Sequence, residues 1–229
     1  MRNQFGAIET TPDFAVQLIN EAEKVGVFTR GIASDRKQRG SSINVDCYGY
    51  DQEQGLVIIQ VRQCMFNKHK GYFNKVRKDY YLIGHTESGN IFAHPVPSPA
   101  RSRRALESPE RTVRWVLAKI WSCEENELDD IVRQGDVAFI PARLPASAQP
   151  VLDENGQPIK EITIRETHKI IALHQGSILK SGDTYYVARA AKAVHTKRQH
   201  DTVRVKNGFY RVQAGIRESI WGFTAPKGD

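Results

Sequence analysis

The second half of the chain carries the pattern that most constrains its fold, a series of short segments in which apolar and polar residues alternate. Such alternation is typical of strands with one buried and one solvated face. The pair Asn207-Gly208 predicts a hairpin, because both central positions of a type I′ turn need positive φ. We therefore expect this half to be β-rich, a barrel or a sandwich. The expected strands are 137–140, 161–165, 169–173, 184–189, 202–206, 209–214 and 216–221.

Two segments of the first half predict helices. Thr11, Pro12 and Asp13 supply an N-cap, a proline at the first helical position and an acid in the first turn, and apolar residues then recur at helical spacing up to Gly26. Ser108-Pro109-Glu110 repeats this start, and the apolar residues that follow indicate a second helix to about Cys123.

Between the helices the period changes to two. Segments 43–47 and 56–62 predict a hairpin, and 79–84 and 91–93 predict further strands. The proline-rich, arginine-rich segment 95–104 favours a linker or an exposed loop. The fold class expected is thus α+β: an N-terminal helix with a small antiparallel sheet, a second helix, and then the β-rich barrel or sandwich. The expected domains are 1–130 and 131–229.

Composition places the chain among ordinary globular proteins. Apolar residues make up 40% and charged residues 26%, which excludes a disordered or collagen-like chain. No apolar run is long enough to span a bilayer and no signal-peptide pattern opens the chain, so we expect a soluble, cytoplasmic protein without a membrane partner. The three cysteines lack CxxC spacing and indicate neither a disulfide framework nor a cysteine zinc site.

Positive charge interleaved with aromatic rings is the main functional signal. The net charge is +7, and cations that neutralise phosphates beside rings that stack on bases are what a single-stranded nucleic-acid surface requires. The same pattern also fits a solvated basic face that meets an acidic protein partner. The candidate nucleic-acid-binding residues are Lys68, Lys70, Lys75, Arg77, Lys78, Arg111, Arg114 and Trp115.

Residues 12–78 resemble the core of the PD-(D/E)xK nucleases, in which acids and a lysine bind a divalent metal and activate water. Asp46, Gln60 and Arg62 match the strand positions of that motif and are the candidate catalytic residues. Arg62 stands where the family has lysine, and Gln60 brings no charge to a metal, so we expect the fold resemblance to come without activity. The carboxylates of the preceding helix that would complete the site are Glu21 and Glu23.

Histidines concentrate in the second half and are the candidate metal ligands. His195 and His200 flank a basic loop, and His168 precedes an expected strand. Imidazoles gathered on neighbouring strands could ligate zinc or iron, or serve as acid and base on a phosphodiester. Surface or structural histidines are the alternative. A divalent metal is accordingly the one cofactor that the sequence suggests.

Two segments, 133–137 and 195–218, resemble a pattern seen in uncharacterised bacterial proteins, which implies one family architecture and no substrate. The function expected from the sequence is intracellular binding of nucleic acid, with single-stranded RNA or DNA preferred over duplex. The alternatives are a metal-dependent phosphodiesterase or nuclease, and a basic protein-interaction subunit of a bacterial complex.

Overall fold

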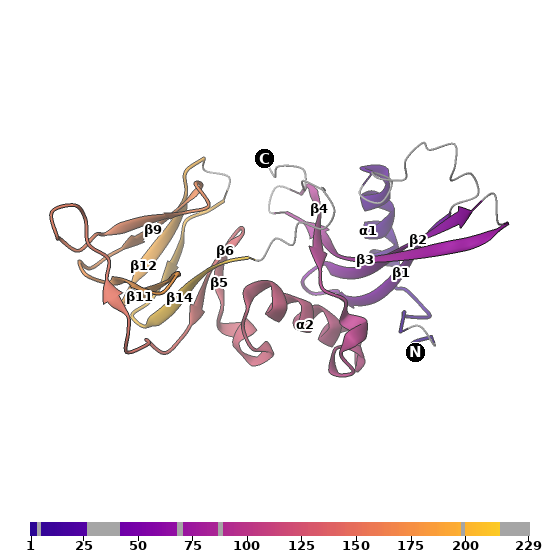
Figure 1. Ribbon diagram of the computed structural model, residues 1–229, viewed down its shortest axis with the longest axis horizontal. Coiled ribbons are helices and arrows are strands. Elements are labelled where there is room, and N and C mark those ends of the chain that lie inside the picture. Colours follow the sequence, from indigo (N-terminus) through magenta and orange to yellow (C-terminus); the bar gives the residue numbers. More distant parts are fainter. Residues whose placement is uncertain (4–5, 27–41, 68–70, 87–88, 198–199, 216–229) are drawn as a thin grey trace. The chain divides into compact units, whose positions relative to one another are not determined.

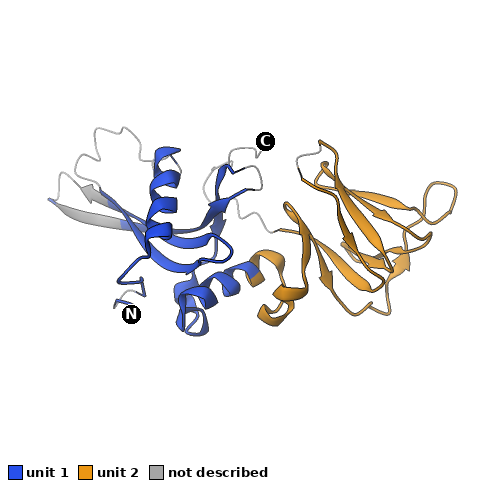
Figure 2. Cartoon of the chain, turned by 180° about the vertical axis from the view of Figure 1, so that it is seen from behind, with its two compact units in different colours: residues 1–117, 217–228 blue, residues 118–216, 229 orange. Residues whose placement is uncertain are grey.

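The computed structural model is drawn in Figure 1, and it divides into two compact units (Figure 2). Unit 1 is Met1–Leu117, and unit 2 begins at Ala118. The division falls inside helix α2 (Pro109–Trp121), upstream of the boundary expected at residue 130. The residues described are 1–3, 6–26, 42–67, 71–86, 89–197 and 200–215, with only the backbone described for 65–67 and 72–75.

Unit 1 contains helix α1 (Asp13–Lys24) and one four-stranded antiparallel sheet. Its strands follow the chain order β1-β2-β3-β4, so each hairpin adds the next strand. The hairpin predicted between 43 and 62 is confirmed, with longer arms than expected. The strands are β1 (Ser42–Asp51), β2 (Leu56–Asn67), β3 (Tyr72–His85) and β4 (Ile91–Val96).

Helix α1 packs against one face of this sheet. Ala15, Leu18 and Ala22 are its buried residues, and they share a core cluster with Ile59 and Val61 of β2. The three helix residues lie on one side of α1 by their spacing, and Ile59 and Val61 lie on one face of β2 because they alternate. The apolar side of the helix therefore packs on that face of the sheet. The opposite face of β2 therefore carries the even-numbered residues.

The segment expected to be irregular is partly ordered. Strand β4 includes Pro95, and β4 is the edge of its sheet, where a strand can lack one backbone donor. Two short 3-10 turns follow, η2 (Pro99–Arg101) and η3 (Arg104–Leu106), before α2 begins at the expected Pro109. No helix among the described residues has the length and apolar character needed to cross a membrane.

Unit 2 is built from two antiparallel sheets after the 3-10 helix η4 (Glu125–Asp130). One sheet has the order β5-β6-β14-β11-β10-β7 and the other the order β13-β12-β9-β8. The strands are β5 (Val132–Gln134), β6 (Val137–Pro141), β7 (Gln149–Pro150), β8 (Glu161–Ile164), β9 (His168–Ala172), β10 (Ile178–Ser181), β11 (Thr184–Ala188), β12 (Ala191–His195), β13 (Val203–Val205) and β14 (Phe209–Ala214).

Both sheets contribute to one hydrophobic core. Phe139 and Val187 come from the six-stranded sheet, and Ile170 and Ala193 come from the four-stranded sheet, all within the same buried cluster. None of the sheets formed by the described strands closes into a barrel. The fold class is therefore α+β with antiparallel sheets, as expected, and the barrel is not formed.

The hairpin predicted at Asn207-Gly208 is wrong. Strand β13 before the pair belongs to the four-stranded sheet, and β14 after it belongs to the six-stranded sheet, so the segment carries the chain from one sheet to the other. Asn207 Oδ1 accepts the backbone N–H of Ala190 at 3.2 Å instead of supporting a tight turn. A side-chain contact far along the chain has overridden the local turn preference.

The environment of Cys47 gives a testable prediction for unit 1. Burial raises the pKa of its thiol to about 11, so at pH 8 only about one molecule in a thousand carries the thiolate that reacts with alkylating reagents. We expect iodoacetamide at pH 8 to spare Cys47 in the folded protein and to modify it in urea. Mass spectrometry of each cysteine peptide measures this, with the half-buried Cys64 as the internal comparison; early alkylation of Cys47 would contradict it.

Candidate metal centre

The three candidate histidines lie together in unit 2. His168 opens β9 and His195 closes β12, and the two residues are direct partners in the antiparallel register, with ring centroids 4.7 Å apart. His200, on the segment between β12 and β13, lies with its ring centroid 5.1 Å from that of His195 and 6.1 Å from that of His168. One ring nitrogen from each residue lies within 4.8 Å of the other two. In the described part of the chain, no other group of histidine, cysteine and acidic residues has this geometry.

The strand pattern explains why these rings point inward. His168 and Ile170 alternate with more exposed residues along β9, and Ala193 and His195 do the same along β12. The histidines thus continue the core-facing side of the sheet to its end, and His168 is only 2% exposed and His195 only 4%. His200 is half-buried. Two imidazoles occupy positions where a strand of this kind usually buries an apolar side chain.

The turn between β5 and β6 brings a carboxylate to the cluster. Asp136 Oδ1 lies 3.4 Å from Nδ1 of His168, and Thr167 Oγ1 lies 3.0 Å from the same nitrogen. The other carboxylate oxygen of Asp136 lies 3.6 Å from Nη1 of Arg165. A carboxylate beside Nδ1 favours the tautomer with the proton there, which leaves the lone pair of Nε2 available to a metal.

Nε2 of His168 is buried and has no hydrogen-bond partner. Leaving a buried polar atom unpaired costs free energy, and native structures rarely do so without a reason such as an ion or a water at the site. The buried Oε1 of Gln134 also lacks a partner, while its Nε2 donates to the carbonyl of Asp201 at 2.6 Å, next to His200. Two unsatisfied acceptor atoms therefore border the segment that carries His200.

Metal binding would change the hydrogen bonding of His195. Its Nδ1 accepts the backbone N–H of Lys197 at 3.3 Å, which places the proton of the neutral ring on Nε2. Ligation through Nε2 moves that proton to Nδ1 and ends this long hydrogen bond, whereas ligation through Nδ1 replaces it directly. Either route releases the amide of Lys197.

The electrostatics keep the two buried rings neutral. Burial lowers the pKa of His168, and the Coulomb repulsion of His195 and His200 adds to this effect against the opposing pull of Asp136. Burial also lowers the pKa of His195, with His200 as the next cause. Neutral imidazole is the form that binds metal ions, so these two ligands need lose no proton at pH 7.

The donor set fits a transition metal with an open coordination position. Imidazole nitrogens suit zinc, copper, iron and nickel. Zn–N bonds of about 2.0–2.1 Å in tetrahedral geometry place ligand nitrogens roughly 3.3 Å apart, so small side-chain rotations would close the cluster around an ion. Three protein ligands leave one position for water, as in catalytic zinc sites, whereas structural zinc sites have four protein ligands.

Gly135 makes room for the cluster, which gives a testable prediction. A Cβ at this position would lie 2.7 Å from Nε2 of His200 and 3.3 Å from Nε2 of His168, and its φ of +55° is left-handed. Gly182 has nearly the same φ, +57°, but open space around its Cβ position. We expect Gly182→Ala to cost about 1–2 kcal/mol of unfolding free energy from backbone strain, and Gly135→Ala to cost about 1–3 kcal/mol more from the contact.

Urea denaturation of the two variants measures the difference between their free energies of unfolding. Equal losses would show that the histidines move aside without cost and that the cluster is not tightly held. A larger loss for Gly135→Ala is expected to be accompanied by loss of metal binding, because the methyl group occupies the space between two ligand atoms.

The residues that match the nuclease motif are engaged in other contacts. Gln60 is 2% exposed, and its Nε2 donates to the hydroxyls of Tyr48 and Tyr80, the first at 3.2 Å. Asp46 pairs with Arg62 at 3.4 Å across the β1–β2 ladder. All of them lie on the sheet face away from α1, because the neighbouring Ile59 and Val61 pack against the helix.

The helix acids do not join that constellation. Glu21 pairs with Nε2 of His85 at 2.8 Å, and Glu21 and Glu23 belong to α1, which covers the opposite face of the sheet from Asp46. The carboxylates that a divalent metal would need are thus separated by the sheet. The nuclease resemblance stays a prediction, and the contacts of unit 1 do not favour a metal site there.

Two of the candidate nucleic-acid-binding residues, Arg77 and Lys78, lie on opposite faces of the sheet. Arg77 pairs with the buried Asp79 at 2.7 Å on the α1 face, whereas Lys78 projects from the other face beside Arg62. Arg111 pairs with Glu107 at 2.6 Å, and Arg114 and Trp115 are half-buried on α2. Lys68 and Lys70 lie outside the described residues, and the side chain of Lys75 is not among those described.

The residues that support the histidines were not predicted from the sequence. Gln134, Gly135 and Asp136 were noted only as part of the segment 133–137, and Arg165 only as the end of an expected strand, whereas all four border or support the cluster. The fold brings side chains of the turn at Gly135 and Asp136 to the histidines His168 and His200, which lie far from them along the chain. Comparisons of the chain with family models, curated proteins and solved structures return no match.

Proposed function

We propose that unit 2 binds a transition-metal ion through His168, His195 and His200 and uses it to activate water for hydrolysis. The observation that carries the proposal is the convergence of three ring nitrogens within 4.8 Å, one of them buried and unpaired. Asp136 supports it as the residue that would hold His168 in the ligating tautomer. An ion held by these histidines would lower the pKa of a water bound at its open coordination position and so supply a nucleophile at neutral pH.

A phosphodiester is the substrate class we propose for this centre. The chain is basic, with a net charge of +7, which favours anionic substrates. Arg165 lies beside Asp136 at the cluster, and its positive charge is felt by His168. A metal ion held by the three histidines would supply an activated water for attack on phosphorus, and cationic side chains such as Arg165 would offset the negative charge of the substrate.

Metal titration tests the ligand set. We expect the chelator-treated chain to bind one equivalent of Zn²⁺, with Co²⁺ giving the visible absorption of a tetrahedral site. His168→Gln should abolish stoichiometric binding, and Asp136→Asn should weaken it about 10- to 100-fold by removing the support of one ligand. His174→Gln is the matched control, because His174 is exposed and outside the cluster. Equal binding by the His168 and His174 variants would refute the site.

Hydrolysis of an activated phosphodiester, bis(p-nitrophenyl) phosphate, tests the activity and separates the two metal hypotheses. Activity that needs added Zn²⁺, Mn²⁺ or Co²⁺ and disappears in His168→Gln belongs to unit 2. Activity that disappears in Asp46→Ala and survives in His168→Gln would instead support the nuclease resemblance of unit 1. Metal binding without turnover would leave the site as a binding centre and refute the proposed reaction.

We propose nucleic-acid binding by unit 1 as a second function, and a specific pairing favours it. Arg62 and Lys78 are direct partners across β2 and β3, and like charges placed opposite each other destabilise a sheet. Asp46 offsets only part of this repulsion, from 3.4 Å. A polyanion on this face would remove the rest.

Salt-dependent titration of a labelled single-stranded oligonucleotide tests this second proposal. Each phosphate contact adds roughly 0.7 to the slope of log K against log salt, so the double variant Arg62→Ala, Lys78→Ala should lower the slope by about one unit or more. Lys24→Ala, which removes a cation from α1 on the other face, should leave the slope unchanged. Equal competition by heparin would indicate a basic face without nucleic-acid specificity and would favour an acidic protein partner.

A further inference from the structure

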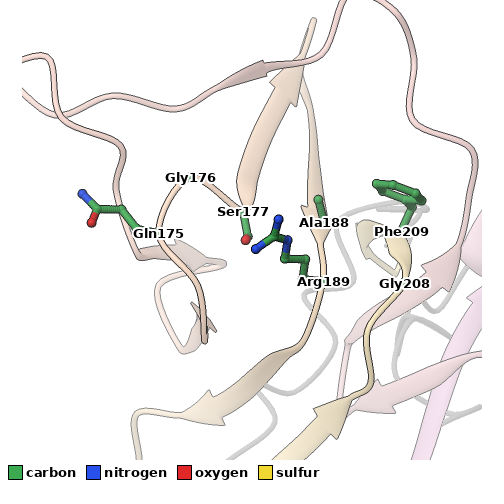
Figure 3. Close-up of a pocket in the computed structure, with 7 residues that line it drawn as sticks. All are labelled: Gln175, Gly176, Ser177, Ala188, Arg189, Gly208 and Phe209. Atoms are coloured by element: carbon green, nitrogen blue, oxygen red, sulfur yellow. The ribbon is translucent and has the colours of Figure 1, made fainter.

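Unit 2 contains a hollow of about 400 Å³, and Figure 3 shows the residues that line it. Because Ala188 and Arg189 line it and β12 begins at Ala191, the hollow lies near the start of β12, at the end opposite to His195. Three segments line it, and backbone hydrogen bonds join them: the N–H of Ala188 donates to the carbonyl of Ser177 at 2.8 Å, and the N–H of Arg189 donates to the carbonyl of Gly208 at 2.7 Å. Because β12 runs from Ala191 to His195, about 13 Å of strand separates this hollow from the histidines. The hollow is a site distinct from the metal centre.

Arg189 has an unusual backbone at the edge of this hollow. Its φ is +82°, a left-handed conformation that costs a side chain free energy and costs glycine none. The hydrogen bond from its N–H to Gly208 holds it there. Strained non-glycine residues are found mainly at functional sites, which indicates a role for the Arg189 side chain. The side chain is exposed, and among the described residues it forms no ion pair.

An aromatic ring lies on the neighbouring segment. Phe209, the first residue of β14, is 53% exposed and is the register partner of Ala188. Ala188 and Gly208 are small, so they leave the hollow open on the side of this ring. In Figure 3 the side chain of Gln175 points away from Arg189, so the polar side-chain groups left to the hollow are the guanidinium and the buried Ser177 hydroxyl.

We propose that this hollow binds a nucleotide unit, with the base stacked on Phe209 and the phosphate paired with Arg189. An exposed ring offers the stacking face that any base accepts, and an unpaired guanidinium offers the planar donor pair that matches phosphate. Ser177 supplies a further hydroxyl donor. A free nucleotide and a residue of a single strand share this chemistry. The proposal does not depend on the metal centre or on the basic face of unit 1.

Calorimetric titration of the full chain with uridine monophosphate and with an eight-residue oligouridylate tests the site. We expect Arg189→Gly to weaken binding at least about tenfold, the effect of one charged hydrogen bond, and Phe209→Ala to weaken it about tenfold or more. Leu152→Ala is the control for Phe209→Ala, because Leu152 is as exposed as Phe209 and does not line the hollow. Equal affinity for both probes identifies a free nucleotide as the ligand, and tighter binding of the oligomer identifies a strand.

Arg189→Gly also separates function from folding. Because glycine adopts a φ of +82° without strain, the relief of strain offsets the added freedom of the unfolded chain, so this variant should melt within a few degrees of the unaltered chain while it binds less. Arg189→Lys keeps a cation and should retain part of the affinity. Undiminished binding by Arg189→Gly, or no binding of either probe by the unaltered chain, would overturn the proposal. The double variant Arg62→Ala, Lys78→Ala leaves the hollow intact and should bind the mononucleotide as tightly as the unaltered chain. Loss of mononucleotide binding in this variant would also overturn the proposal.

Discussion

The antiparallel register of β9 against β12 is the constraint on which the candidate metal centre depends. This register makes His168 and His195 direct partners and turns both toward the core shared by the two sheets. A slip of one residue would turn one of them to the other face of the sheet, since successive side chains point to opposite sides. Alternate core residues along both strands resist that slip, because it would also expose Ile170 or Ala193.

The register explains the positions of His168 and His195, and the six-stranded sheet supplies the residues that support them and His200. The β5–β6 turn places Asp136 against Nδ1 of His168, and Gly135 in the same turn leaves space for His200. Three protonated imidazoles at these separations would repel one another strongly, and burial would increase the cost. The pKa values of His168 and His195 are lowered, so the buried rings are uncharged and this repulsion is avoided. Neutral imidazole is also the form that binds a metal ion. The stable fold and metal binding therefore both require these two rings to be uncharged.

Local sequence patterns predicted the helices and the first hairpin because short-range physics decides them. Helix α1 follows from one apolar stripe with a proline at its start, and β2 follows from a run of β-branched residues. Strand β12 was missed because Ala191–His195 contains alanines and a lysine, which do not favour strands by themselves. Its position between β13 and β9 is a tertiary effect.

The candidate site divides in the same way. Imidazole chemistry and clustering along the chain were enough to select His168, His195 and His200. The role of Asp136 could not be predicted, because it depends on a turn in the other sheet reaching the end of β9. Arg77 and Lys78 show the converse error: neighbours in a charged run became residues of opposite faces once β3 extended through the segment. Charge counted along a chain does not locate a surface until the strand period is known.

Backbone strain in unit 2 lies at the two ends of this strand pair. Among the described non-glycine residues of unit 2 with positive φ, Ser122 follows the last residue of helix α2, where such a conformation is common. The others are Arg165 and Glu166, just before His168, and Arg189, just before β12. Specific contacts hold two of them, the Asp136 carboxylate for Arg165 and the Gly208 carbonyl for Arg189. The regular middle of β9 and β12 fixes the distance between the two ends of the strand pair. Strained residues at these ends can hold their side chains in fixed positions, whereas an unstrained loop would leave them free to move.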